Sequence, residues 1–292
     1  MGQTRKPLVF LLVATCTTLF FVLWYRSNTK STSPNSVITE PPILEPSSPY
    51  LPTPSPTPPP TAIPLLPWQK IGNDIDGEAS GDNSGSSVSL SSDGKTVAIG
   101  AIRSGHVRIF QWTESTSAWT QMGADIDGEA SYLDNSGQSV SLSSDGKTVA
   151  IGAPYNEDGN GFDRGHVRIF QWTQSTSTWT QMGADIDKEA YGDESGSSVS
   201  LSSDGKTVAI GAPNFEGNAP LSGHVRIFQW TESTSAWTQV GVDIDGEASG
   251  DGSGWSVSLS SDGKTVAVGA ILNDGNGSSS GHVRIFQWNS YE

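Results

Sequence analysis

SVSLSSDGKTVAIGA, at residues 87–101, decides the fold of this chain. In its first half, serines alternate with apolar residues, which is typical of a β-strand with one buried face. The Asp-Gly pair that follows favours a tight hairpin in which both turn residues have a positive φ. The second half, TVAIGA at 96–101, is nearly all apolar, as in a strand that is buried on both faces. The stretch therefore predicts two antiparallel strands joined by a short turn.

The stretch occurs four times, with its first valine at 88, 140, 199 and 257, and the fourth copy differs only in having Val268 in place of the isoleucine. Each copy follows a segment such as WTQMGADIDGEA, which begins at Trp68, Trp119, Trp179 and Trp237. Each copy precedes a GHVRIFQW segment, whose histidine is residue 106, 166, 224 or 282. The HVRIFQW and WTQMGADI segments read as two further strands, so each unit predicts four strands. Repetition on this scale indicates a solenoid, a propeller or another array.

The order of the segments favours an all-β propeller of four four-stranded blades. The repeat region begins with a WQKIG segment and ends with a HVRIFQW segment, so one blade is complete only if the two ends combine. Trp68–Ile75 would then be the outer strand of the last blade, which removes the exposed sheet edges. The alternative is an open arc that a second chain completes.

The repeat resembles the FG-GAP type of β-propeller repeat, which occurs in integrin α-subunit heads and in many extracellular repeat proteins. The matching features are Gly-x-Ser-Val before the first strand, VAIGAP after the hairpin and GHVRIF in the third strand. The resemblance covers residues 68–292. A similarity to WD40 repeats is weaker, because the period is longer and the Trp-Asp dipeptide is absent. FG-GAP proteins often bind calcium between the first two strands, but here that loop, Ser91–Thr96, is too short to surround Ca²⁺.

The composition divides the chain into three segments. Residues 1–30 have four basic and no acidic residues, and their uncharged run Leu8–Tyr25 is near the minimum length of a transmembrane helix. We expect an uncleaved, single-pass membrane anchor there, the alternative being a cleaved signal peptide. Residues 31–67 hold 13 of the 17 prolines, which predicts a disordered, extended stalk. Such a stalk suits a C-terminal domain, residues 68–292, that lies outside the cytoplasm.

Charge and residue type exclude several functions for residues 68–292. This segment has 12 basic and 29 acidic residues, a net charge of −17, which argues against nucleic-acid binding. Cys16, the single cysteine, lies in the N-terminal apolar run, so residues 68–292 have no disulfide and no cysteine nucleophile. Every Ser, His and Asp of the repeat recurs in each unit, whereas an active site needs unlike groups at one place.

We therefore expect a binding or adhesion module and not an enzyme, with an extracellular protein or a glycan as its ligand. A hydrolase of the propeller fold is one alternative. A self-associating structural surface protein is another.

Three longer loops interrupt the repeat, and function is expected there. In the loop 155–165, four side-chain oxygens have the spacing i, i+2, i+4 and i+7, which is compatible with Ca²⁺. They belong to Asn156, Asp158, Asn160 and Asp163. A turn rich in Gly and Asn is the alternative. The loop aromatics that could stack on a sugar, pack on a protein or cover the blade below are Tyr155, Phe162 and Phe215.

The repeat also carries two polar motifs. In HVRIFQ, the residues His, Arg and Phe alternate with Val, Ile and Gln, so we expect the histidines to share one strand face with the arginines in a structural role. In Asp-x-Asp-x-Glu, the carboxylates could share a cation. Alternatively, Asp and Gly shape a turn there and the acids keep the surface soluble.

Overall fold

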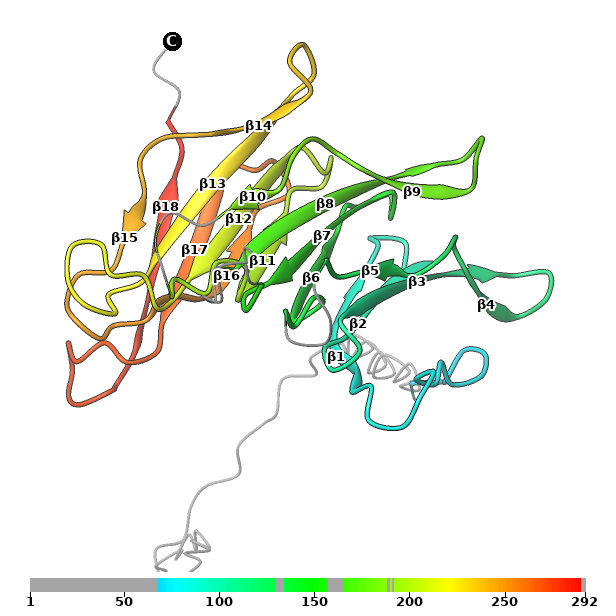
Figure 1. Cartoon of the computed structure of the whole chain (residues 1–292), viewed down its shortest axis with the longest axis horizontal. Coiled ribbons are helices and arrows are strands. Elements are labelled where there is room, and N and C mark those ends of the chain that lie inside the picture. Colours follow the sequence, from blue (N-terminus) through cyan, green and yellow to red (C-terminus); the bar gives the residue numbers. More distant parts are fainter. Residues whose placement is uncertain (1–67, 130–133, 157–164, 188–189, 191, 290–292) are drawn as a thin grey trace, which may run out of the picture. The chain divides into compact units, whose positions relative to one another are not determined.

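The structure is a computed structural model that describes residues 68–129, 134–156, 165–187, 190 and 192–289. Every regular element in these residues is a β-strand, from β1 to β18. The strands form four antiparallel sheets, one for each repeat, which follow one another in chain order (Figure 1). The expected all-β architecture of repeated antiparallel sheets is confirmed.

The strand bounds repeat from sheet to sheet. Sheet 1 contains β1 (Ser84–Leu90), β2 (Thr96–Ala101), β3 (His106–Thr113), β4 (Ala118–Gln121) and β5 (Ile126–Asp127). Sheet 2 contains β6 (Ser139–Leu142), β7 (Thr148–Ala153), β8 (His166–Thr173), β9 (Thr178–Gln181) and β10 (Ile186–Asp187). Sheet 3 contains β11 (Ser198–Leu201), β12 (Thr207–Ala212), β13 (His224–Thr231), β14 (Ala236–Gln239) and β15 (Ile244–Asp245). Sheet 4 contains β16 (Ser253–Leu259), β17 (Thr265–Ala270) and β18 (His282–Gln287).

The Asp-Gly hairpin differs from the predicted turn. Only the glycine of the pair has a positive φ, 69° at Gly94. The carboxylate of Asp93 accepts hydrogen bonds from Ser91 Oγ at 2.6 Å and from the Lys95 amide at 2.9 Å. The prediction of two left-handed turn residues is therefore wrong, because the aspartate side chain closes a longer loop and a single left-handed glycine suffices.

The fourth strand is split in two in each of sheets 1 to 3. β4 and β5 both pair with β3, but Gly123 lies between them with φ 74°. A Cβ on Gly123 would lie 3.0 Å from the Trp172 ring of the next sheet. The single strand that the sequence predicted is therefore broken where the backbone makes room for this tryptophan.

The core lies between consecutive sheets. The front face of a sheet carries the Val and Ile of its third strand, and the back face carries the apolar residues of the first strand and the Phe of the third. At each of the three junctions, the front face of one sheet packs on the back face of the next. At the first junction, Val107 and Ile109 pack with Val140, Leu142 and Phe170. The predicted alternation of Val and Ile with His, Arg and Phe along the third strand is confirmed, because Val and Ile face the following sheet and the other set faces the preceding one.

Polar bonds fix the spacing between the sheets. The Leu142 amide donates to Ser89 Oγ at 3.0 Å, and Ser87 Oγ donates to the Gly137 carbonyl at 2.6 Å. A Cβ on Gly100 would lie 2.1 Å from that carbonyl oxygen. The glycine of TVAIGA is thus needed where two sheets approach closely.

The two ends of the repeat region do not meet in the predicted way. Sheet 4 has three strands, and Trp68–Ile75 forms no strand. This segment contacts sheet 1 instead, because Trp119 Nε1 donates to the Ile71 carbonyl at 3.2 Å. Closure of the last blade by the N-terminal segment is therefore not shown.

The predicted anchor and stalk, residues 1–67, lie outside the described residues. Within the described part of the chain, no helix has the length and apolar character needed to cross a bilayer.

Candidate functional site

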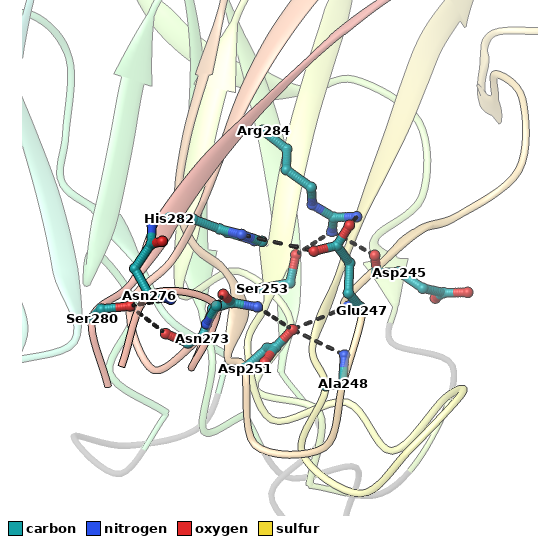
Figure 2. Close-up of polar contacts among 11 residues, drawn as sticks. Asp245, Glu247, Ala248, Asp251, Ser253, Asn273, Asn276, Ser280, His282 and Arg284 are labelled. Carbon is teal, nitrogen blue, oxygen red and sulfur yellow. Dashed lines mark hydrogen bonds and ion pairs between the residues drawn. The ribbon is translucent and has the colours of Figure 1, made fainter. Parts of the chain in front are cut away.

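One end of every sheet gathers the loops that vary in sequence, and a buried aspartate holds them together. In sheet 4, a carboxylate oxygen of Asp251 accepts hydrogen bonds from the Ala248 amide at 2.9 Å, the Glu247 amide at 3.1 Å and Asn273 Nδ2 at 3.1 Å (Figure 2). The Leu272 amide donates to the Asp251 carbonyl. The loop that precedes the first strand is thereby joined to the loop that follows the second strand.

The same aspartate recurs in the other sheets and is buried in each, as Asp82, Asp134 and Asp193. Ser104 Oγ donates to Asp82, and this bond, followed by one from the Ala79 amide, lowers the pKa of Asp82 below its usual value. The loop end therefore has a constant frame, a buried aspartate in every sheet, under loops of different sequence.

The predicted calcium loop begins on this frame. The Tyr155 amide donates to the Asp134 carbonyl at 3.3 Å. Asn156 is buried, and its carbonyl accepts a bond from the Gly165 amide. The remaining predicted residues of this loop, Asp158, Asn160, Phe162 and Asp163, lie outside the described residues. Calcium binding here stays a prediction.

Phe215, a predicted ligand-contact residue, packs against the histidine of its own repeat, in sheet 3. Its ring stacks on the His224 imidazole with 3.8 Å between ring centroids and 25° between planes. Phe215 thus helps to cover a buried histidine, in line with the alternative that the loop aromatics cover the blade. A ligand contact of Phe215 or Tyr155 stays a prediction.

In sheets 1 to 3, the structure joins the two polar motifs into one histidine–carboxylate cluster for each sheet. Each cluster offers an imidazole nitrogen and two carboxylate oxygens within 4.8 Å of one another. Three such sets are Glu78 with His106 and Asp125, Glu129 with His166 and Asp185, and His224 with Asp243 and Asp245. In sheet 2, His166 Nδ1 lies 3.6 Å from Asp185 and 4.0 Å from Glu129.

An arginine completes each cluster and links it to the preceding sheet. Arg168 Nη2 donates to the Asp127 carbonyl at 2.6 Å, and its guanidinium lies over the Phe170 ring at 5.4 Å. In sheet 1, Arg108 Nη1 lies 3.6 Å from Glu78. In sheet 4, Glu247 lies between His282, at 3.7 Å, and Arg284, at 3.8 Å (Figure 2). The Asp-x-Asp-x-Glu motif thus connects one sheet to the next, a role that neither interpretation of its sequence included.

Burial keeps the inner histidines neutral. Burial is the largest cause that lowers the pKa of His166 to about 4, with Arg168 acting in the same direction and Asp185 opposing it. Burial and Arg226 likewise lower the pKa of His224 to about 4, against the effect of Asp243. A neutral imidazole with two carboxylates is a donor set that suits a divalent cation. In sheets 1 and 4, however, an arginine already brings positive charge to the glutamate, so there the polar groups also serve as a junction between sheets without a cation.

The comparisons with known proteins agree with the repeat character of the chain. Residues 242–286 match the FG-GAP repeat. The chain is similar to hydrazine synthase of Kuenenia stuttgartiensis, with 15% identity and a TM-score of 0.45 over 75% of this chain and 49% of that one. It is also similar to TolB of Acinetobacter baumannii, with 17% identity and a TM-score of 0.38 over 69% of this chain and 43% of that one. The chain therefore spans less than half of either protein. A search of curated protein sequences gives no match.

Proposed function

Because residues 242–286 are an FG-GAP repeat and three further units copy its sequence, we propose that this chain is a binding or adhesion module anchored in a membrane. Its β-propeller-type domain lies outside the cytoplasm on a proline-rich stalk. The observation that carries the proposal is the loop end of the sheets. A buried aspartate recurs under loops whose sequences differ, and a constant frame that carries variable loops is typical of binding scaffolds.

The polar groups of the domain support a binding role over a catalytic one. Within the described residues, the histidine–carboxylate clusters have nearly the same composition at each junction. A catalytic centre requires unlike groups that converge on one reacting atom. The loops 155–165, 214–223 and 272–281 are the parts that differ, so we assign ligand contact to them. The ligand class is an extracellular protein or a glycan.

Glycosylation tests the location of the domain. Asn276-Gly-Ser is the one N-glycosylation sequon in the sequence, and Asn276 is exposed. On expression of the full chain in eukaryotic cells, we expect a mass shift that endoglycosidase removes and that Asn276→Gln abolishes. The topology test uses a C-terminal tag on chains that have reached the cell surface. If antibodies detect this tag only after the cells are permeabilised, the domain is cytoplasmic and the proposal is contradicted.

Ligand screening tests the binding role. The full chain in detergent would be applied to a glycan array and to a panel of extracellular proteins. We expect binding that a Phe215→Ala, Tyr155→Ala double variant weakens, with the hairpin variant Ser233→Ala as the control. Hydrolysis of glycosides or esters that the same double variant abolishes would instead support the hydrolase.

A further inference from the structure

The two terminal sheets expose apolar faces that their counterparts bury. On the back face of sheet 1, Val88 and Leu90 are 65% and 59% exposed, whereas Val140 and Leu142 at the same positions of sheet 2 are 9% and 7% exposed. On the front face of sheet 4, Ile285 is 71% exposed, whereas Ile109 in sheet 1 is 2% exposed. Both faces are open in the same chain, so neither covers the other.

These two faces are the two halves of the junction that occurs three times inside the chain. A front face packs on the back face of the next sheet in the junctions between sheets 1 and 2, 2 and 3, and 3 and 4. Repeat proteins that end in solvent usually replace such residues by polar ones in capping repeats. Here the terminal sheets keep Val88, Leu90, Val283 and Ile285. The ends therefore have the composition of an interface.

The N-terminal segment, Trp68–Asp76, already has the position of a fourth strand that belongs to a sheet before sheet 1. The Asp76 carbonyl accepts a bond from Arg108 at 2.6 Å, just as the Asp127 carbonyl accepts one from Arg168. The Ile71 carbonyl accepts a bond from Trp119 Nε1, and its equivalent Met122 accepts one from Trp179. Two hydrogen bonds of a fourth strand with the following sheet are thus present, and the pairing with a third strand of its own is missing.

Sheet 4 lacks that fourth strand. The edge of β18 ends beside a pocket of about 380 Å³, which Val240, Gly241, Val242 and Trp288 help to line. In sheet 3, the tryptophan of the fourth strand, Trp237, donates to the Met182 carbonyl of the preceding sheet. The corresponding acceptor for sheet 4 is the Val240 carbonyl in this pocket, and the corresponding tryptophan is Trp68, which is fully exposed.

We propose that two copies of this chain associate head to tail. The Trp68–Asp76 segment of one copy pairs with β18 of the next, Trp68 fills the pocket, and sheet 1 stacks on the partner's sheet 4. The internal register, in which Gln111 lies opposite Thr120, places Gln69 of one copy opposite the partner's Gln287. This association involves the repeat region alone, so it stands or falls independently of ligand binding by the loops.

The same docking completes the fourth histidine–carboxylate cluster. His282 has Glu247 beside it but lacks the fourth-strand aspartate that Asp125 and Asp185 supply in sheets 1 and 2. The repeat alignment makes Asp74 the equivalent residue. Without a docked segment, Asp74 forms an exposed ion pair with Lys70 at 3.0 Å. Docking therefore adds a specific polar contact to the apolar one.

Paired cysteines test the register. In full-length chains that carry Cys16→Ser, Gln69→Cys is introduced into one chain and Gln287→Cys into a second, and the two are mixed in mild detergent and oxidised. Cross-strand neighbours lie within reach of a disulfide. We expect a two-chain band on a non-reducing gel of the mixture, and far less of it from either chain alone or from Gln69→Cys mixed with the hairpin control Ser233→Cys.

Two further changes keep the outcome decisive. Trp68→Ala in the first chain and Ile285→Glu in the second alter residues that are exposed in a single chain, so each variant should fold, as circular dichroism would verify. Each should weaken association by about 100-fold, while Ser233→Glu leaves it unchanged. A third chain that carries both Gln69→Cys and Gln287→Cys tests closure: a disulfide that forms only within this single chain, with no two-chain band, would show that the chain closes on itself and overturn the proposal. A yield equal to the Ser233→Cys control, or one that neither variant lowers, would also overturn it.

Discussion

Replacing the same isoleucine at equivalent positions of two sheets should have very different effects. Ile169 is 2% exposed at the junction of sheets 2 and 3, and Ile285 is its counterpart in sheet 4, at 71% exposed. Truncation of a buried isoleucine to alanine removes packed methylene groups and leaves a cavity, at a cost of about 2–5 kcal/mol. Ile169→Ala should therefore lower the free energy of unfolding by about 3 kcal/mol. Ile285→Ala should lower it by under about 1 kcal/mol in a single chain.

Urea denaturation of the full chain in mild detergent, followed by near-UV circular dichroism, measures both values. At low protein concentration, only Ile169→Ala should move the midpoint strongly. At high concentration, head-to-tail association buries Ile285, so its variant should lose stability relative to the wild-type chain. Equal losses for the two variants at low concentration would refute the sheet order and the exposure on which this comparison depends.

Three other changes test the junctions and the loop end. Gly152→Ala places a Cβ 2.1 Å from a carbonyl oxygen of the next sheet and should destabilise the fold by several kcal/mol in a thermal melt. The Cβ of Gly269→Ala meets only Ser256, with its hydroxyl nearest, so this variant should lose less stability, and equal losses would contradict the close approach of the sheets. His166 and His224 have folded pKa values of about 4 against about 6.5 when unfolded, so the free energy of unfolding is unaffected above pH 6.5 and falls as the pH drops towards 4, by up to about 3 kcal/mol for each histidine. A variant with both histidines replaced by glutamine should flatten that part of a pH–stability curve, and an unchanged curve would contradict burial as the cause. Asp251→Ala leaves three donors unpaired and should lower the free energy of unfolding by about 2–4 kcal/mol and speed proteolysis within 272–281. Asp262→Ala in the exposed hairpin is the control, and unchanged proteolysis of the Asp251 variant would contradict the anchoring role of Asp251.

The sequence predicts the strands of one unit well, because a β-strand can be identified from the local alternation of apolar and polar residues. The bounds of β2, TVAIGA, and of β3, HVRIFQWT, follow the apolar pattern closely. The break between β4 and β5 does not, because its cause is the Trp172 ring of the next sheet, a contact across 49 positions of sequence. The Asp93 turn was mispredicted for a different reason, since its side-chain bonds replace the second left-handed residue.

The polar site was harder to predict than the fold. The histidines, arginines and Asp-x-Asp-x-Glu segments were each visible as repeated motifs, but their combination depends on which sheet follows which. Glu129 reaches His166 of the next sheet, whereas Asp185 reaches the same histidine from within its own sheet. A signal was present in the equal order of these residues in every unit, and only the stacking of the sheets turns that order into proximity.

Association of the open ends would change what the loop end can do. A head-to-tail contact joins different surfaces of the two copies, so it generates either a closed ring or a growing row, depending on the rotation at each step. In both cases every copy adds its own variable loops beside those of its neighbour. Several weak loop contacts on one assembly bind a multivalent surface far more tightly than one contact alone, because later contacts form at a high effective concentration. Variants that block docking, such as Trp68→Ala, should therefore weaken binding to a dense ligand surface while leaving the affinity for a single soluble ligand unchanged. An equal loss of binding in both assays would mean that Trp68 contacts the ligand itself. No loss of binding in either assay would mean that ligand binding does not depend on association of the chains.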